Sequence, residues 1–307
     1  MAKTKTAGKK RLSSIRDTAG DRAFLAFVYV MLSFILVIVL FPLIYIVSAS
    51  FSSPQAVVSG EVWLWPVRPT LRGYEAVFKN PKLMTGFFNS FYYMILGTVV
   101  NLVVTLLCAF PLTRKQFKAR NIVAGLMVFT MYFSGGLVPT YMVVKNLGLV
   151  DTRLAMIIPG AMSVWNMILC RTYISSTIPE ALYESATMDG CAPLRFLIKI
   201  VMPLSTPILA VLALYYGIAH WNTYFNALIY LNRTELVPLQ IVLREVLVLN
   251  RVDPTMIADA RELAAKQGLI DLLKYSVIVV ASVPVMVIYP FVQKYFVRGV
   301  MIGAVKG

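Results

Sequence analysis

The chain has 307 residues, of which 59% are hydrophobic and only 14% are charged, and its mean hydropathy is +0.74. An ordinary soluble protein is about 45–50% apolar and about 25% charged, so this composition excludes a soluble globular protein and predicts an integral membrane protein. The formal net charge is +15, but many of the basic residues gather in the first 22 positions and beside apolar runs. Basic residues in those places orient membrane spans, so we expect no nucleic-acid binding.

Stretches long enough to cross a membrane follow one another along the chain. A membrane helix needs about 20 apolar residues without uncompensated charge. Runs free of Asp, Glu, Lys and Arg occupy 23–60, 83–113, 121–144, 154–170, 200–232 and 275–293. They predict an all-α membrane protein with six transmembrane helices. The first run is too long for a cleaved signal peptide, so we expect it to stay as an anchor.

The basic residues also predict how the chain is oriented. Cytoplasmic loops carry the excess of Lys and Arg, and six spans would place the segments with most of the net positive charge on the side of the N-terminus. Both termini are therefore expected in the cytoplasm. The chain would comprise a basic tail at 1–22, a six-span domain at 23–296 and a cytoplasmic tail at 297–307.

A long segment at about 232–271 would then lie on the opposite side of the membrane. Asp253 followed by Pro254 is typical of a helix start, and Gly268 soon after Lys266 is typical of a helix end. We therefore expect a short helix in this loop, on a surface that a partner outside the cytoplasm can reach.

The predicted spans lack the residues that ion-driven transport or catalysis needs. No Asp, Glu, Lys or Arg lies in the six apolar cores, whereas such groups mark ion pathways and proton relays. The chain has no HExxH, GxSxG or GxxxxGK[ST] motif, so we assign no catalytic residue and exclude ATP hydrolysis by that route. Three cysteines without CxxC spacing predict neither a metal site nor a disulfide framework.

Uncharged polar side chains do occur within the spans. The clearest are Asn89, Ser90, Asn101, Asn166, His220, Asn222 and Asn226. One interpretation is hydrogen bonding between membrane helices. The other is a wet, uncharged pathway for hydroxyl-rich solutes, for which the candidate residues are Asn166, His220, Asn222 and Asn226.

The third apolar run contains its own interruption. Gly135, Gly136 and Pro139 lie within five positions of one another. Such residues break or bend a membrane helix and free backbone groups. We expect either a packing kink or a hinge that lines a pathway.

The segment 176–207, on the cytoplasmic side, predicts two short helices between the fourth and fifth spans. Thr177 and Glu180 have the spacing of a capping box, and Gly190 suits the end of the helix that follows. Pro193 can open the second helix. A docking face for a partner's groove would come from Glu180, Tyr183, Glu184, Ala186, Met188 and Asp189.

This segment resembles the EAA loop of binding-protein-dependent ABC importer permeases. The matching residues are Glu184, Ala186, Asp189, Gly190, Phe196, Ile200, Pro203 and Pro207, with Ser185 where an alanine is common. A glutamate, a glycine six residues on and a proline thirteen beyond that rarely coincide after a transmembrane span.

Other stretches are similar to the carbohydrate-uptake branch of these permeases. They are Asn89-Ser90, 134–141, 147–152, Trp221-Asn222 and the tail 297–307. Within this branch the chain resembles the smaller permease of the maltose importer, and more closely the permeases for complex oligosaccharides and polysaccharide fragments.

The resemblance implies a type I ABC importer permease fold with a cytoplasmic EAA coupling loop at about 176–203. The chain would be a non-catalytic subunit in the cell (inner, cytoplasmic) membrane. It would form one sugar pathway with a second, homologous permease and operate by alternating access. Two ABC ATPase subunits would dock on the loop and bind the ATP and Mg, since this chain is expected to bind no cofactor. An extracytoplasmic solute-binding protein would deliver an oligosaccharide, and the 232–271 loop would reach that protein.

The resemblance also assigns the residues of the coupling loop. They are Tyr183, Glu184, Ser185, Ala186, Met188, Asp189, Gly190 and Pro203. Two alternatives stay open from the residues: an importer permease for a non-carbohydrate solute, and an intramembrane enzyme or scaffold without transport activity. A charged solute would favour compensating charge in the spans, which is missing, and a scaffold would not need the glutamate–glycine–proline spacing.

Overall fold

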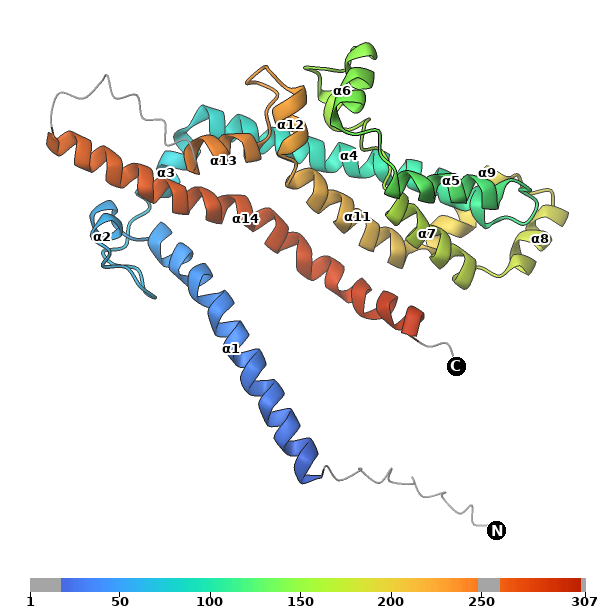
Figure 1. Ribbon diagram of the computed structural model, residues 1–307, viewed down its shortest axis with the longest axis horizontal. Coiled ribbons are helices and arrows are strands. Elements are labelled where there is room, and N and C mark those ends of the chain that lie inside the picture. Colours follow the sequence, from blue (N-terminus) through green and yellow to red (C-terminus); the bar gives the residue numbers. More distant parts are fainter. Residues whose placement is uncertain (1–17, 248–259, 305–307) are drawn as a thin grey trace, which may run out of the picture.

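The computed structural model describes residues 18–247 and 260–304, and every regular element within these ranges is a helix (Figure 1). Three helices are long and apolar enough to cross a membrane: α1 (Ala19–Ser50), α4 (Pro81–Thr113) and the Gly268–Pro290 part of α14 (Ala260–Ala304). Two bent pairs raise the number to five if each pair is one span: α5 (Arg120–Tyr132) with α6 (Leu137–Asn146), and Pro193–Leu204 with α11 (Thr206–Trp221). The described chain is thus an all-helical protein with three to five candidate spans, and a sixth stays a prediction.

The remaining elements are short and connect or cover the long helices. They are α2 (Pro54–Val58), α3 (Arg72–Lys79), η1 (Arg153–Met156), α7 (Val164–Thr177), α8 (Glu180–Met188), α9 (Pro193–Phe196), η2 (Leu197–Val201), α10 (Met202–Leu204), α12 (Phe225–Tyr230) and α13 (Leu239–Leu247). The predicted fourth span, 154–170, is divided between η1 and α7, with Pro159 and Gly160 between them. The 14 residues of α7 rise about 21 Å, which is less than the roughly 30 Å hydrocarbon core of a bilayer.

The chain turns sharply at the interruption of the third apolar run. The axes of α5 and α6 differ by 116°, and the break lies between Tyr132 and Leu137. Gly136 has φ +86°, a left-handed conformation that residues with a Cβ seldom adopt. Pro139 falls in the first turn of α6, where its missing N–H leaves no bond unmade.

One expectation from the sequence is wrong on α14. The helix end expected at Lys266-Gln267-Gly268 does not exist, because α14 continues from Ala260 to Ala304. Gly268 instead lies against α2, where a Cβ would stand 3.2 Å from the Cβ of Pro54. A close helix contact, rather than a helix end, accounts for this glycine. The helix start expected at Asp253-Pro254 falls outside the described residues.

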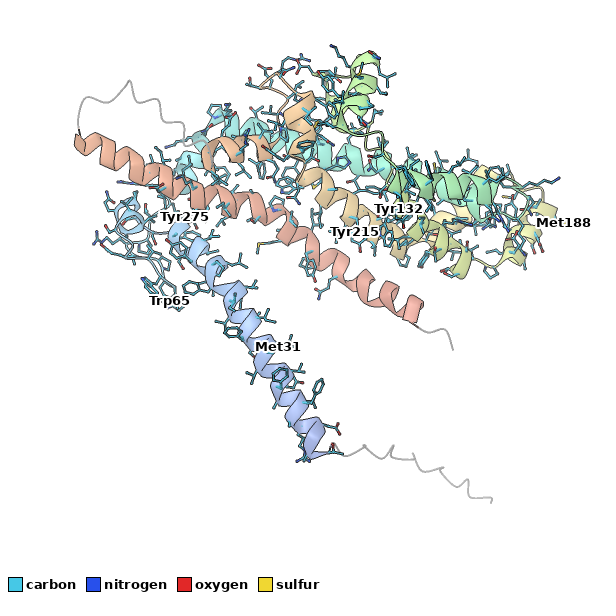
Figure 2. The ribbon with its side chains drawn as sticks, viewed as in Figure 1. Met31, Trp65, Tyr132, Met188, Tyr215 and Tyr275 are labelled. Carbon is cyan, nitrogen blue, oxygen red and sulfur yellow. The ribbon has the colours of Figure 1, made fainter. Side chains whose placement is uncertain are left out.

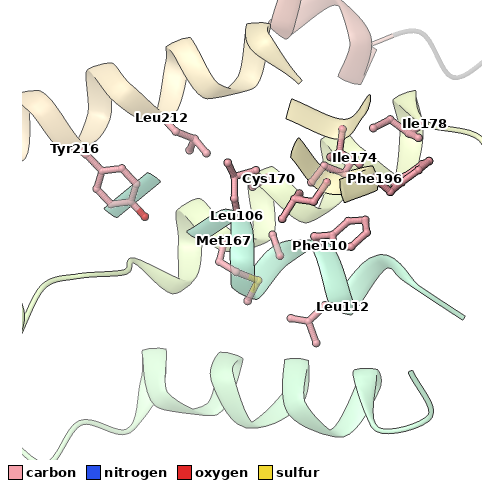
Figure 3. Close-up of a cluster of buried hydrophobic side chains, with 13 residues drawn as sticks. Leu106, Phe110, Leu112, Met167, Cys170, Ile174, Ile178, Phe196, Leu212 and Tyr216 are labelled. Atoms are coloured by element: carbon pink, nitrogen blue, oxygen red, sulfur yellow. The ribbon is translucent and has the colours of Figure 1, made fainter. Parts of the chain in front are cut away.

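The core is built around α4. This helix packs against α7 and α11. Its N-terminal part also contacts α3 and α13. A buried hydrophobic cluster joins α4, α7, α9 and α11 at one end, with Phe110, Met167 and Leu212 among its members (Figure 3). A second cluster, which includes Trp221 and Val277, joins α4, α11, α13 and α14.

By contrast, α1 extends away from this core (Figure 1). Of its 32 residues, only Ser48, Ala49 and Ser50 are buried, where α1 meets α14. Apolar side chains such as Met31 project outward along the helix (Figure 2). A helix that is apolar on every side needs lipid or another helix around it, as expected of a membrane span.

Candidate functional site

The segment that resembles a coupling loop forms two helices, α8 and α9, at one end of α4 (Figure 1). Gly190 has φ +72° between them. Its N–H donates to Thr187 O at 3.0 Å, and the N–H of Cys191 donates to Ala186 O at 2.9 Å. These bonds satisfy carbonyls at the end of α8 in the Schellman pattern, which requires the left-handed residue that glycine supplies.

The capping box expected at the start of α8 does not form. Thr177 is the last residue of α7, and Pro179 is the N-cap of α8 without a side-chain hydrogen bond. Glu180 points instead to Arg114 at the C-cap of α4, with Oε2 3.9 Å from Nη1. A tertiary ion pair therefore replaces the local cap.

One side of α8 is attached to the core and the rest is exposed. Tyr183 and Ala186 pack against the buried cluster, although no residue of α8 is itself buried. Met188 is 88% exposed at the far end of the helix (Figure 2). The predicted coupling residues Glu184, Ser185, Met188, Asp189 and Gly190 are all exposed.

Pro203 lies apart from α8, on the stretch that leads into α11. It is the second residue of the short α10, which directly follows the π-helical segment η2, and it is exposed. A proline has no N–H to donate and its ring collides with the carbonyl four residues earlier, so a wider helical turn before it is the expected adjustment. The axis of Pro193–Leu204, which includes this stretch, differs by 85° from the axis of α11.

The four candidate pathway residues divide into two that are buried and two that are exposed. Asn166 on α7 and His220 on α11 are each only 7% exposed. His220 Nε2 lies 3.3 Å from Asn101 Oδ1, and Asn101 Nδ2 donates to Gly160 O at 2.9 Å. His220 thus takes part in a hydrogen-bonded contact between helices.

Asn222, unlike those two residues, borders a cavity of about 360 Å³ between α11, α13 and α14. Gln240 and Ser282 add an amide and a hydroxyl to its lining, among apolar side chains. Gln240 Nε2 is 3.5 Å from Asn222 Oδ1. The fourth candidate, Asn226 on α12, is exposed.

Polar residues in the N-terminal part of α4 hold the segment that leads to α13. Asn89 Nδ2 donates to Glu235 O at 2.7 Å and to Val237 O at 3.0 Å. Ser90 Oγ accepts from Leu239 N at 2.9 Å. From the sequence, Asn89 and Ser90 could serve either as helix contacts or in a pathway. In the structure, Asn89 bonds to the segment before α13, and Ser90 bonds to the first residue of α13.

Asp151 makes a similar attachment that the sequence alone did not single out. It has φ +60°, and its Oδ1 accepts hydrogen bonds of 2.9 Å from the N–H groups of Asn232 and Arg233. Arg233 Nε adds a bond of 3.1 Å to Oδ2. The backbone N–H groups of Arg233 and Asn232 lower the pKa of this carboxyl group from its ordinary value. Arg233 lies 82 residues away, too far for a local pattern to reveal the contact.

Comparisons with known proteins show what kind of protein has this arrangement. No model of a protein family matches the chain. It is 36% identical to protein LplC of Bacillus subtilis (strain 168) over 298 residues, or 96% of this chain and 99% of that protein. It is 37% identical to the polygalacturonan/rhamnogalacturonan transport system permease protein YtcP of the same organism over 288 residues, or 94% and 99%.

A solved structure agrees with these relatives. In a crystal structure of a bacterial ABC transporter involved in the import of the acidic polysaccharide alginate, one chain superposes with a TM-score of 0.86 at 33% identity, covering 92% of this chain and 100% of that one. The chain belongs to the permeases of carbohydrate ABC importers. This membership confirms the resemblance seen in the sequence. Permeases of this family are non-catalytic, multi-pass membrane subunits, so the alternatives of an intramembrane enzyme and of a scaffold are set aside.

Proposed function

We propose that this permease forms, with a second homologous permease, the translocation pathway of an ATP-driven, binding-protein-dependent importer for an oligosaccharide or polysaccharide fragment. The observation that carries the proposal is the exposed helix α8. It has no buried residue, yet the loop around it is anchored to the core by Phe196, which is fully buried. A helix held in this way on one side presents the other side to a partner.

The partners at α8 would be two ABC ATPase subunits. Glu184 and Asp189 supply exposed acid, and Met188 supplies an adaptable apolar side chain at the end of the helix. ATP and Mg would be bound by the ATPases and not by this chain. Docking there would place α8, the tail 1–22 and the tail 297–307 on the cytoplasmic side of the cell membrane.

The second permease would cover part of the surface that this chain leaves apolar. Apolar side chains along α1 are exposed from Phe24 to Val47. Lipid and a homologous subunit would share this surface, and the pathway would run between the two permeases. The break at Gly135, Gly136 and Pro139 would act as a hinge during alternating access.

The solute pathway would include the cavity beside Asn222. Amide groups of Asn222 and Gln240 and the hydroxyl of Ser282 can hydrogen-bond to sugar hydroxyls without a charge. Asn166 and His220 are buried in this state, so they would meet solute only after the helices move. Asn226 is exposed and available on α12.

On the outer side, the loop 232–271 would meet the solute-binding protein. Its described part includes α13, which α4 holds through Ser90 and Leu239. Because α13 is firmly attached to α4, a partner that binds α13 can shift the spans and not only the loop. We therefore expect α13 to be part of the docking surface.

The relatives favour a fragment of an acidic polysaccharide as the solute. Those at 33% identity or more include one named for polygalacturonan and rhamnogalacturonan and one for alginate. A permease named for the neutral sugars melibiose, raffinose and stachyose is 26% identical over 80% of this chain. We therefore place acidic fragments first among the sugars to test.

The test is purification from native membranes in mild detergent, followed by an ATPase assay in lipid nanodiscs. The expected result is recovery of a second permease and an ATPase, with hydrolysis that rises when the co-purified binding protein and a partial digest of polygalacturonan are added. A raffinose and stachyose mixture serves as the neutral arm. Recovery of this chain alone would contradict the importer proposal, and stimulation by the neutral mixture alone would contradict the acidic solute.

A further inference from the structure

A buried arginine joins the end of α4 to the two-helix loop. Arg114 is the C-cap of α4, and its side chain is only 6% exposed. Its guanidinium carbon lies 5.1 Å from the centre of the Phe110 ring and 4.8 Å from the centre of the Tyr183 ring. Phe110 belongs to α4 and Tyr183 to α8, so cation–π contacts hold the guanidinium between the two helices.

An acidic side chain on α8 faces the same guanidinium. Glu180 Oε2 is 3.9 Å from Arg114 Nη1, and the Glu180 side chain is 22% exposed. Among the described residues, neither Nη1 of Arg114 nor Oε1 of Glu180 has a hydrogen-bond partner. Burial lowers the pKa of the Arg114 guanidinium, and the charge of Glu180 opposes that change. Two opposite charges that are shielded from water attract each other more strongly than two exposed charges. Removing either partner would leave the other as an unpaired buried charge, which is costly.

A third aromatic ring, from α9, packs against the rings of Phe110 and Tyr183. The ring of Phe196 on α9 is fully buried, 6.2 Å from the Phe110 ring and 5.0 Å from the Tyr183 ring. Figure 3 shows Phe110 and Phe196 within the buried cluster. We call the set Phe110, Arg114, Glu180, Tyr183 and Phe196 the α4–loop joint.

The neighbour of Arg114 shows that its burial is specific. Lys115 also carries a positive charge, but it is exposed. Both lie in the short basic stretch 114–120, which the sequence explains as a signal for membrane orientation. Orientation does not require a basic side chain to be buried between aromatic rings, so Arg114 needs a second explanation.

We propose that Arg114 is a positioning residue for transport: with Glu180 it fixes α8 to the end of α4, so that movement imposed on α8 passes into α4. This inference rests on the proposed docking of ATPases at α8. The helix α4 is continuous over 33 residues, and its outer end binds the segment before α13 through Asn89 and Ser90. It therefore links the cytoplasmic loop to the outer surface.

A link of this kind predicts coupling in both directions, since coupling between two binding sites is reciprocal. Sugar-loaded binding protein outside would raise ATP hydrolysis inside only while the α4–loop joint is intact. A weakened joint would leave the ATPases bound and active but poorly responsive. Bound, active ATPases with little stimulation would indicate a positioning role, whereas a general loss of structure would also abolish binding or basal hydrolysis.

The experiment uses the whole importer in nanodiscs, with Arg114→Gln and Glu180→Gln as variants and Lys115→Gln as the matched control. The probe is the co-purified binding protein with the polygalacturonan digest. Three quantities are measured: retention of the ATPase, hydrolysis without binding protein, and the factor by which loaded binding protein raises hydrolysis. The double variant Arg114→Glu with Glu180→Arg tests whether the charges act as a pair.

We expect Arg114→Gln to retain the ATPase, to preserve basal hydrolysis and to lose about fivefold or more of the stimulation, and we expect Glu180→Gln to lose stimulation to a similar extent. The exchanged pair should recover part of the lost stimulation, and Lys115→Gln should match the wild type. Unchanged stimulation in Arg114→Gln would overturn the inference. An equal loss in Lys115→Gln would also overturn it, because net charge of the loop would then be the cause.

Two further outcomes separate this inference from the proposed function. If the wild type itself retains no ATPase or shows no stimulation, the proposed function fails. If the wild type is stimulated but both single variants lose the ATPase, the pair serves assembly only, and the positioning role is overturned. Glu180→Gln guards against a folding defect, because it keeps the shape of the side chain and the whole of Arg114.

Discussion

Gly97 on α4 lies directly against His220 on α11. A Cβ at Gly97 would stand 2.4 Å from the imidazole Nε2 and 2.5 Å from Cε1, far inside van der Waals contact. The glycine leaves room for a ring that reaches across to Asn101, one turn further along α4. A small residue therefore allows a polar contact to form between two helices within the apolar part of the protein.

Gly97→Ala should destabilise the permease for this reason. The added methyl group would displace the His220 ring and break its contact with Asn101, at a cost of about 1–3 kcal/mol. Thermal unfolding of the complex in detergent measures the effect. Gly125→Ala on α5 is the matched control, since no atom beyond the neighbouring backbone of its own helix lies within 4 Å of a Cβ at that position. Equal melting temperatures for the two variants would contradict the role of Gly97.

Asp151→Asn should weaken the attachment between the α6–η1 corner and the segment after α12. Asparagine tolerates the φ of +60°, so the substitution isolates the loss of charge. The bonded N–H groups lower the pKa of Asp151, so its stabilising effect is complete above the unfolded value of about 3.9. It is lost as the pH falls through the lower, folded value.

Melting temperatures of the wild type and Asp151→Asn across a pH series measure this effect. The variant should melt lower at neutral pH, and the difference should shrink below about pH 3.9. Glu75→Gln is the control, because the Glu75–Lys79 pair is exposed and 3.7 Å apart. If the difference in melting temperature between the wild type and Asp151→Asn did not change with pH, the charge of Asp151 would not be the source of the stabilisation.

The sequence revealed features that local composition determines. Apolar runs without charge located α1 and α4, and the Gly135–Pro139 interruption coincides with the bend between α5 and α6. In each case the cause lies within a few residues along the chain. The bilayer requires apolar surface, and glycine and proline alter the backbone where they stand.

Features that depend on distant partners were not predictable in the same way. Glu180 looked like half of a capping box, yet its partner is Arg114, on another helix. Gly268 looked like a helix end, yet it makes room for Pro54. Asn89 bonds to a carbonyl 146 residues away, so the sequence could not decide between a helix contact and a pathway.

Asn89→Ala should loosen the segment that leads to α13. The substitution removes the donor to Glu235 O and Val237 O and also the acceptor for Arg153 Nη2, which lies 3.3 Å from Asn89 Oδ1. Each hydrogen bond that is lost contributes about 0.5–1.5 kcal/mol. Hydrogen exchange should therefore become faster over 235–247 than over α11.

The matched control for this variant is Asn146→Ala, at the exposed end of α6. It should leave exchange over 235–247 unchanged. We also expect Asn89→Ala to reduce the affinity for loaded binding protein, because α13 would be presented less rigidly. If Asn89→Ala exchanged at the wild-type rate over 235–247, the two hydrogen bonds from the Asn89 side chain would not be what holds this segment.

Glu184→Ala on α8 should reduce coupling to the ATPase without affecting the fold. Glu184 is exposed, so its loss leaves no buried group unpaired. If the ATPase binds α8, removal of a charged anchor from a docked helix should lower retention or stimulated hydrolysis by about tenfold or more. Co-purification and stimulated ATPase activity measure this effect, and the melting temperature of the permease should stay constant.

Ser185→Ala is the matched control on the same helix. Its hydroxyl donates to Ala181 O at 2.9 Å, within α8 itself, so its removal takes away no contact with another element. Retention and hydrolysis should match the wild type, because the exposed surface keeps its charge and nearly its shape. Normal activity in Glu184→Ala would mean that this glutamate does not dock the ATPase. A loss in both variants would instead indicate that the exposed face tolerates no change, and a lower melting temperature would point to the helix itself.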